Sequence, residues 1–206
     1  FKTKEPQIHA VHRDFQDLGY SFQWILVDTR DFFLPQRRSR VWMWALRDTP
    51  SAQADEIKTF IQKLATHEAA PAALWDFLET NEQDWTSPEH ALNDRQRKEM
   101  DAGLARINLG DTHDVILDLQ SFNCPQLSSV SPCVAPYSQL YWLNAGRFLT
   151  AREHAALQGI WPCDFPALDS WLRTSHQANL VKDMAGRAFS STVCMAVSFA
   201  VILIAH

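Results

Sequence analysis

The sequence lacks the cysteine and histidine spacings that build a structural metal site. No CxxC pair and no paired Cys/His pattern occurs among its four cysteines and eight histidines. The cysteines are widely and irregularly spaced, at Cys124, Cys133, Cys163 and Cys194. In a chain of 206 residues this spacing is typical of reduced thiols, so we expect an intracellular protein with no metal partner.

An excess of positive charge is also absent. Nineteen lysines and arginines stand against 24 acidic residues, which gives a formal net charge of -5 at pH 7. The chain as a whole therefore does not attract nucleic acid, and any such partner would have to bind a local basic patch. One such patch occurs in the sequence, formed by Arg37, Arg38, Arg40 and Arg47.

No segment predicts a leader peptide or a membrane span. No signal peptide precedes the first residue, Phe1, and the missing initiator methionine leads us to expect the C-terminal part of a longer polypeptide. The apolar run at residues 193–205 is short and is interrupted by Ser198, which argues against a membrane span. We expect a buried helix there and no membrane partner.

The sequence does contain enough apolar material for one good core, since 46% of its residues are hydrophobic and 11% aromatic. Helical spacing of apolar residues predicts helices over residues 8–18 and 51–65. Between them, the aromatic and β-branched runs YSFQWILVD (20–28) and RVWMWALRD (40–48) predict two strands that pair or lie close in one sheet. Pro35 falls in the loop between these strands.

The middle of the chain is less regular. Ser87, Pro88 and Glu89 predict the start of a polar helix that runs to about residue 107. Residues 108–146 contain prolines and only short strand-like pieces such as DVILDL, so we expect a separate, irregular lobe.

Regular structure returns at Thr150. Thr150 and Glu153 form the sequence pattern of a capping box, which predicts a short helix ended by Gly159. After a connector that contains Pro and Trp, we expect a final helix that begins near Ala185 and runs to the end of the chain.

Three segments stand in an order that is typical of one family. Residues 36–40 (QRRSR) open an apolar strand, residues 147–153 (RFLTARE) continue to LQGI at 157–160, and residues 185–188 (AGRA) open the expected last helix. They resemble the QxRxR, R-x-L-T-x-R-E…LQG and final G-N-[SA]-V elements of the cytosine-5 DNA methyltransferases. Their order and spacing together make a chance match improbable.

The resemblance implies an α/β fold, namely the C-terminal portion of a class I, Rossmann-like methyltransferase dependent on S-adenosyl-L-methionine, with an irregular target-recognition lobe. Residues 1–47 would end the catalytic domain with a helix and a hairpin, residues 48–146 would be the target-recognition region, and residues 147–206 would return to the catalytic domain. The hairpin would complete a mostly parallel sheet. The isolated chain would then expose apolar faces meant for its missing half, and we expect it to be poorly soluble or molten.

The chemistry of the family gives the arginines a role. The target cytosine must be flipped out of the stack, and a thiolate that adds at C6 activates C5. A guanidinium can hold a carbonyl oxygen and a carboxylate together, and it stays charged at every working pH. By resemblance, Arg40 grips the base, Arg38 holds DNA or the catalytic loop, Gln36 supports both and Arg37 meets phosphate. Without the family, we would interpret Arg38 and Arg40 as surface ion-pair partners of Asp28 or Asp31.

The resemblance also implies that Gly186, Arg187 and Ala188 lie beside S-adenosyl-L-methionine. Arg187 stands where the family has an asparagine, and a guanidinium cannot both donate and accept as an amide does. Two interpretations stay open: Arg187 meets the carboxylate of the cofactor, or it marks decayed binding.

Three elements of the family are missing. Its Gly-rich cofactor element, its Pro-Cys nucleophile and its Glu-Asn-Val element normally precede QxRxR. Pro132-Cys133 and Pro162-Cys163 stand in the wrong place and lack the flanking residues of a nucleophile loop, so we interpret both cysteines as ordinary thiols. The chain alone is therefore expected to be inactive and to need an N-terminal catalytic half, in the same polypeptide or as a partner chain.

The leading hypothesis is part of an enzyme that methylates cytosine C5 in duplex DNA, in the nucleus if the source is a eukaryote. Two alternatives stay open. One is a non-catalytic nucleic-acid-binding or scaffold relic of the family, favoured by Arg187 and the acidic balance. The other is a cytosine-5 methyltransferase that acts on RNA.

Overall fold

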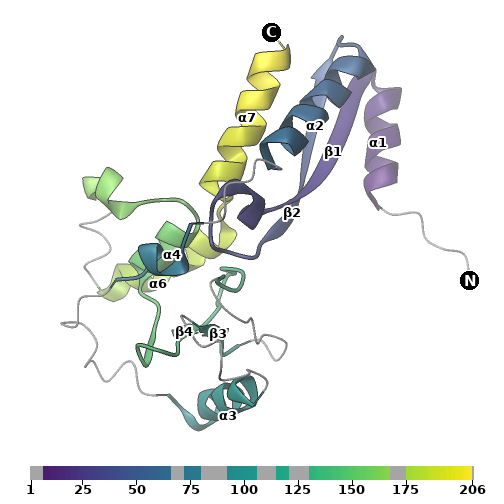
Figure 1. Ribbon diagram of the computed structural model, residues 1–206. Helices are drawn as coiled ribbons and strands as arrows, with labels where there is room; N and C mark the ends of the chain where they lie inside the picture. The colour runs from purple at the N-terminus through teal and green to yellow at the C-terminus, as the bar shows by residue number, and fades with distance from the viewer. Residues whose placement is uncertain are drawn as a thin grey trace, which may run out of the picture.

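The computed structural model describes residues 7–65, 72–79, 92–105, 115–120, 130–167 and 175–205. A β-hairpin with three helices forms one end of the molecule, and a small sheet with one helix forms the other (Figure 1). Two further helices, α4 (Ala151–Leu157) and α6 (Ser175–Arg187), lie between the two ends. The site described below lies at this junction.

The hairpin consists of strands β1 (Tyr20–Asp28) and β2 (Ser39–Arg47). They pair in antiparallel register, with Ile25 opposite Trp42 and Val27 opposite Arg40. The prediction of two strands that pair is therefore confirmed. A short 3-10 helix, η1 (Thr29–Phe32), begins the connection between them.

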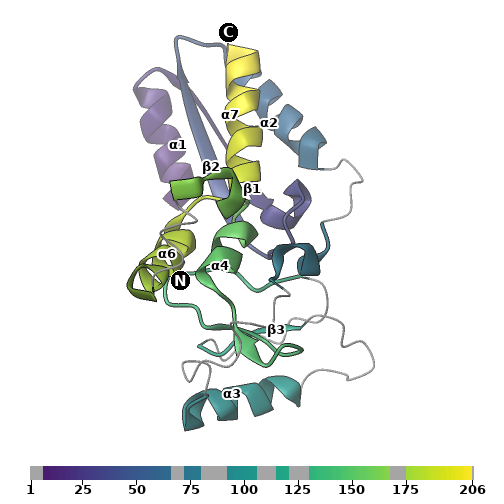
Figure 2. The ribbon, with the colours of Figure 1, turned by 90° about the vertical axis from the view of Figure 1, so that its left-hand side faces the viewer.

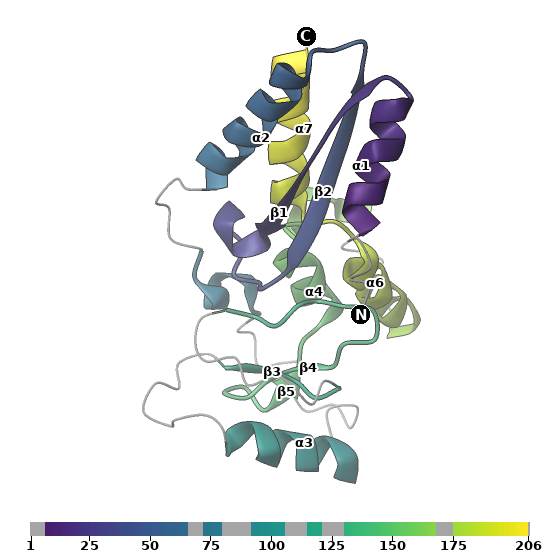
Figure 3. The ribbon, with the colours of Figure 1, turned by 90° about the vertical axis from the view of Figure 1, so that its right-hand side faces the viewer.

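Helices cover both faces of the hairpin (Figure 3). Helix α1 (Gln7–Asp17) packs on one face, where Phe15 stacks on Phe22 with 5.1 Å between ring centroids. Helices α2 (Ser51–Ala65) and α7 (Ser191–Ala205) cover the other face. The core on that side consists of Ile25, Val27, Phe32, Trp44, Ile57, Ile61, Val193, Val197 and Ala200.

The alternation of side chains along a strand explains why this core takes every second residue of the hairpin. The predicted helices 8–18 and 51–65 are confirmed as α1 and α2. Helix α2 falls within the segment 48–146, yet it packs on β1 and α7 at the hairpin end.

The opposite end contains a three-stranded antiparallel sheet in the order β3-β4-β5, with bounds Ile116–Asp118, Leu140–Trp142 and Arg147–Phe148. Helix α3 (Asp94–Leu104) lies beyond this sheet (Figure 2). Its N-cap is Asn93, which forms a capping box with Gln96. The helix start predicted at Ser87–Glu89 lies outside the described residues, and the described helix begins only at Asp94 because Asn93 caps it there.

The capping box at the start of α4 is confirmed. Thr150 Oγ1 accepts a hydrogen bond from the Glu153 backbone N–H at 3.2 Å, and Glu153 Oε2 accepts from the Thr150 N–H at 2.6 Å. Gly159 follows the helix with a φ of 75°, the left-handed conformation that the sequence predicted for its end. Short 3-10 helices, η2 (Leu74–Phe77) and η6 (Pro162–Asp164), pack against α4.

The prediction of a single final helix from Ala185 is wrong. Helix α6 already ends at Arg187, and α7 begins at Ser191 after a break. Phe189 packs on Trp42 within this break, with 5.1 Å between ring centroids, and holds the chain against the hairpin. The residues Gly186, Arg187 and Ala188 therefore close α6 instead of opening the last helix.

Large apolar side chains stay exposed on two faces of the hairpin end. Leu26, Val41 and Met43 lie on the α1 side of the hairpin beyond the cover of α1, and Leu26 is 60% exposed. On α7, Met195 and Phe199 face outward, and Met195 is 71% exposed. Within the described residues, no single helix is long and apolar enough to span a membrane; residues 178–187 and α7 pass that test only together, with a 41° bend between them.

Candidate functional site

The segment QRRSR (36–40) follows the loop after the 3-10 helix η1 and leads into β2, and its side chains alternate between buried and exposed. Gln36 and Arg38 are buried, whereas Arg37, Ser39 and Arg40 are exposed. Gln36 donates through Nε2 to the carbonyl of Leu157 at 2.8 Å. The segment is thus fixed to the end of α4 on one side and presents cations on the other.

Arg38 is the centre of this site, with a side chain buried to 5% exposure. Its guanidinium donates to the carbonyl oxygens of Val134, of Gly186 at 3.2 Å and of Ala188 at 2.8 Å. Burial lowers the pKa of Arg38 below its ordinary value, and the nearby charge of Arg40 acts in the same direction. The forked guanidinium group of Arg38 (the Arg38 fork) therefore joins the start of β2 to the loop at residue 134 and to the end of α6.

Arg40 lies next to Arg38 but on the exposed side. It donates to the Ser39 carbonyl at 2.8 Å, and its Nη2 lies 3.7 Å from Cys133 Sγ. Arg38 Nη1 lies 3.6 Å from the same sulfur. Two guanidinium groups therefore flank the Cys133 thiol, an arrangement that the sequence did not predict. The base-gripping role of Arg40 stays a prediction.

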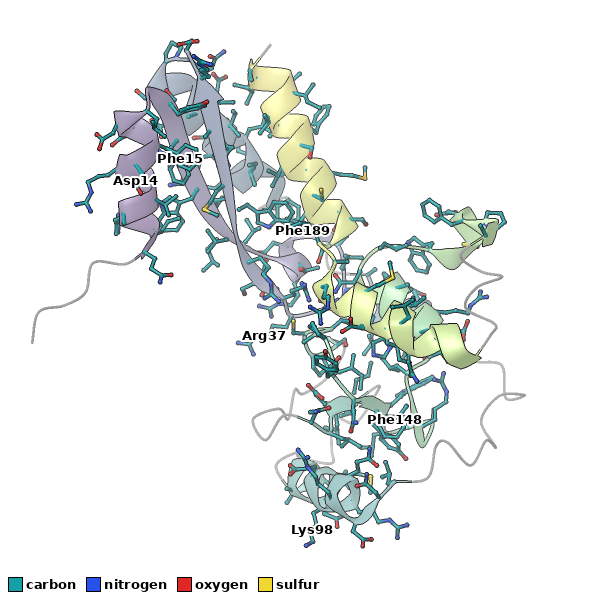
Figure 4. The ribbon with its side chains drawn as sticks, turned by 180° about the vertical axis from the view of Figure 1, so that it is seen from behind. Asp14, Phe15, Arg37, Lys98, Phe148 and Phe189 are labelled. Carbon is teal, nitrogen blue, oxygen red and sulfur yellow. The ribbon has the colours of Figure 1, made fainter. Side chains whose placement is uncertain are left out.

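Asp28 does not pair with these arginines, although the alternative interpretation of the sequence suggested it. Its carboxylate instead accepts from Arg30 Nε at 2.9 Å and from Ser39 Oγ at 2.6 Å. These hydrogen bonds lower the pKa of Asp28, against burial, which is the largest influence and raises it. Arg37 and Arg40 themselves are exposed on the outside of the junction. Figure 4 labels Arg37 there.

The turn at Gly186, Arg187 and Ala188 leaves little room for a cofactor. A Cβ on Gly186 would overlap with the backbone of Ala135 and Pro136, so the chain itself fills the space beside this glycine. The carbonyls of Gly186 and Ala188 accept from Arg38, and Arg187 pairs with Asp183 at 2.9 Å. These three residues do not by themselves fit S-adenosyl-L-methionine.

The matched segment at residues 147–160 organises the junction. Arg147 and Glu153 are both 1% exposed and form a two-pronged ion pair, with Nη2–Oε1 at 2.7 Å and Nη1–Oε2 at 2.8 Å. Gln158 donates to the Ala185 carbonyl at 2.9 Å and accepts from Ser190 Oγ, which ties α4 to α6 and α7. The sequence predicted the capping role of Glu153 but not its arginine partner.

Comparison with known structures defines the class. The chain matches the crystal structure of the S. pombe Dnmt2 methyltransferase with a TM-score of 0.61 at 17% sequence identity. The match covers 100% of this chain and 64% of the S. pombe chain. This chain therefore spans only part of the length of that protein. The expected α/β fold, that of a Rossmann-like methyltransferase, is confirmed.

A family model supplies the more specific assignment. The model for C-5 cytosine-specific DNA methylases matches residues 2–201. The chain therefore belongs to the C-5 cytosine-specific DNA methylase family. A search of curated proteins by sequence found no match. Within the described residues, no cluster of three or more His, Cys, Asp or Glu side chains could hold a metal ion.

Proposed function

We propose that this chain is the base-gripping and target-recognition part of an enzyme that transfers a methyl group from S-adenosyl-L-methionine to cytosine C5 in duplex DNA. The observation that carries the proposal is the buried fork of Arg38, which fixes the QRRSR segment at the junction of both ends of the molecule. Arg37 and Arg40 leave the same short segment toward solvent, where a polynucleotide can reach them.

In this proposal Arg38 is a positioning residue. Its bonds to the carbonyls of Gly186 and Ala188 hold the start of β2, so Arg40 extends from a rigid strand instead of a loop. A guanidinium at Arg40 would stabilise the negative charge that develops on the cytosine carbonyl when a thiolate adds to the ring. Arg37 would meet a backbone phosphate.

The nucleophile and the cofactor site would come from an N-terminal half outside this chain. The exposed apolar surfaces at Val41 and Met43 on β2 and at Met195 on α7 are of the kind that a covering domain buries. The chain alone would then be inactive, and S-adenosyl-L-methionine would supply the methyl group from a site built mainly by that half. DNA substrate would make this an intracellular, and in eukaryotes nuclear, protein.

The test is methyl transfer by the intact protein to duplex DNA and to RNA of the same sequence. We expect DNA to be methylated and Arg40→Ala to lower kcat by about 10²- to 10³-fold, the usual cost of losing one donor to a developing oxyanion. The control Arg47→Ala removes an exposed arginine at the far end of β2 and should leave kcat unchanged. Methylation of the RNA alone would overturn the DNA assignment.

A second candidate is a non-catalytic relic that binds nucleic acid, and the turn at Gly186 favours it. The glycine is packed against the backbone of Ala135, and Arg187 is paired with Asp183. Binding of S-adenosyl-L-methionine to the intact protein, measured by calorimetry, separates the two. A protein that binds duplex DNA but not the cofactor would be the relic.

A further inference from the structure

A short parallel bridge fixes the loop that carries Cys133 against the arginine segment. Gln36 and Ser131 pair in parallel. The backbone N–H of Arg37 donates to the Ser131 carbonyl at 3.0 Å, and the Ser131 N–H donates to the Pro35 carbonyl at 2.7 Å. Cys133 follows two residues later, so its thiol is held beside the side chains at the start of β2.

Two guanidinium groups contact this thiol. Arg38 Nη1 lies 3.6 Å from Cys133 Sγ, and Arg40 Nη2 lies 3.7 Å from the same atom. Burial lowers the pKa of Arg38, and attraction to Cys133 is the largest influence in the opposite direction. The carboxylate of Asp28, opposite the start of β2, is engaged by other side chains. Among the described residues, no carboxylate forms an ion pair with Arg40, so its charge is available to an anion.

A second thiol of the chain has the opposite surroundings. Cys133 is partly exposed beside two positive charges, whereas Cys163 is exposed with its Sγ 3.8 Å from Oδ1 of Asp164. Reactive cysteines lie in partly exposed, positively charged surroundings, because the thiolate is the form that reacts. The two thiols therefore form a matched pair, one beside positive charge and one beside negative charge.

The surroundings of Cys133 favour a reagent that is itself an anion. Arg37 and Arg40 are exposed, and guanidinium groups bind carboxylates well. A disulfide that carries carboxylates is therefore attracted to this thiol before it reacts. During thiol–disulfide exchange the reacting sulfur atoms share one negative charge, which nearby guanidinium groups stabilise.

We propose that Cys133 is a reversible modification site for a small anionic disulfide of the glutathione type. The thiol loses its proton to solvent, and the thiolate attacks one sulfur of the disulfide. A new S–S bond forms while the old one breaks, and the other half leaves as a thiolate, so Cys133 is oxidised and the disulfide is reduced. The attached carboxylates would cover Arg40 and block it for nucleic acid. Only this last effect rests on the proposed function.

The first experiment measures how fast each cysteine of the intact protein reacts with glutathione disulfide, followed by mass spectrometry of peptides. We expect Cys133 to react at least about tenfold faster than Cys163. Cys133 should also react faster with this anionic disulfide than with cystamine, a cationic one. A rate no higher than that of Cys163, or equal rates with both reagents, would overturn the proposal.

Substitution of nearby charges tests the cause of the reactivity. Arg40→Gln should slow the modification of Cys133 by about tenfold and leave the rate of Cys163 unchanged. Arg47→Gln, at the far end of β2, should change neither rate. Asp164→Asn removes the carboxylate beside Cys163 and should speed the reaction of that thiol. An unchanged rate of Cys133 in Arg40→Gln would contradict the proposed role of the guanidinium.

Binding of duplex DNA measures the consequence of the modification. Treatment of the intact protein with glutathione disulfide should weaken DNA binding by about tenfold, the cost of losing about one cationic contact near 0.1 M salt, and dithiothreitol should restore it. The same treatment should not change the DNA affinity of Cys133→Ser. An equal loss in Cys133→Ser would overturn the blocking of Arg40.

The two proposals fail in different ways. Rapid modification of Cys133 in a protein that never binds DNA would overturn the proposed function alone. DNA binding by a protein whose Cys133 reacts no faster than Cys163 would overturn this inference alone.

Discussion

At the scale of single residues, the contacts of Arg38 depend on the planar shape of its guanidinium group as well as on its charge. A lysine in its place keeps the charge but cannot donate to Val134, Gly186 and Ala188 in one plane. We expect Arg38→Lys to lower the free energy of unfolding of the intact protein by about 2–3 kcal/mol, because buried carbonyls lose their donors.

Denaturant unfolding measures this effect, with Arg37→Lys as the control. Arg37 is exposed, so its substitution should change the free energy of unfolding by no more than about 0.5 kcal/mol. Equal effects of both substitutions would show that the fork of Arg38 contributes no more than a surface charge.

The buried pair of Arg147 and Glu153 makes a second prediction at this scale. Glu153 is only 1% exposed, and Glu153→Gln removes its negative charge and leaves the buried charge of Arg147 without compensation. This should destabilise the protein by about 3–5 kcal/mol. The double variant Arg147→Met/Glu153→Leu removes both charges and should be more stable than Glu153→Gln alone. A double variant no more stable than Glu153→Gln would contradict a coupled ion pair.

His154 predicts how stability depends on pH. Its pKa in the folded protein, about 4, lies below the ordinary value of 6.5, so the unfolded chain takes up a proton first as the pH falls. The stabilisation is complete above pH 6.5 and is lost as the pH falls toward 4, by about 3 kcal/mol in total.

Denaturant titrations between pH 7 and pH 4 check this window. His154→Gln should lose this part of the pH dependence, whereas His9→Gln, on the exposed side of α1, should keep it. An identical pH profile for the wild type and His154→Gln would show that the ring is not held neutral.

At the scale of elements, the contact between the end of α6 and the loop at residue 135 is close enough to require glycine. A Cβ on Gly186 would lie 2.6 Å from the Ala135 carbonyl oxygen and closer still to the neighbouring backbone atoms. Backbone atoms cannot move away as a side-chain end can, so Gly186→Ala should separate α6 from the loop and lower the melting temperature of the intact protein.

Gly103→Ala is the comparison for this prediction. Its Cβ would meet only the side chain of Leu117, at 3.2 Å, and alanine favours the helix α3. We expect a much smaller effect on the melting temperature, measured by calorimetry. A larger loss in Gly103→Ala than in Gly186→Ala would contradict the close packing described for α6.

The sequence predicts elements well where the cause is local. The hairpin and α2 follow from alternation and helical spacing, and the start of α4 follows from a capping box within four residues. The break between α6 and α7 does not follow, because Phe189 is held there by Trp42, far away in the sequence. The burial of Arg38 is equally hidden, since its acceptors are backbone carbonyls that leave no side-chain pattern.

At the scale of the whole molecule, the exposed apolar surface predicts how the chain behaves on its own. Leu26, Val41 and Met43 form one surface on the hairpin, and Met195 and Phe199 form another on α7. We expect the isolated chain to bind a hydrophobic dye and to elute as aggregates in size-exclusion chromatography.

Charged substitutions on these surfaces give the control. Met43→Lys and Met195→Lys should improve the solubility of the isolated chain and weaken its association with the proposed N-terminal half, expressed separately. Asp101→Lys, on α3 at the other end, should leave that association unchanged. A soluble, cooperatively melting monomer of the wild-type chain would contradict the need for a covering domain.

The hydrogen bonds of Arg38 can form only after most of the chain has been synthesised. Its acceptors lie 96, 148 and 150 positions further along the chain, so none exists when the arginine leaves the ribosome. The loops that must close are long, and such closures come late on a folding pathway. A product that ends before residue 188 therefore lacks part of this acceptor set, and the arginine segment is fixed to the junction by all three hydrogen bonds only in chains whose synthesis has passed residue 188.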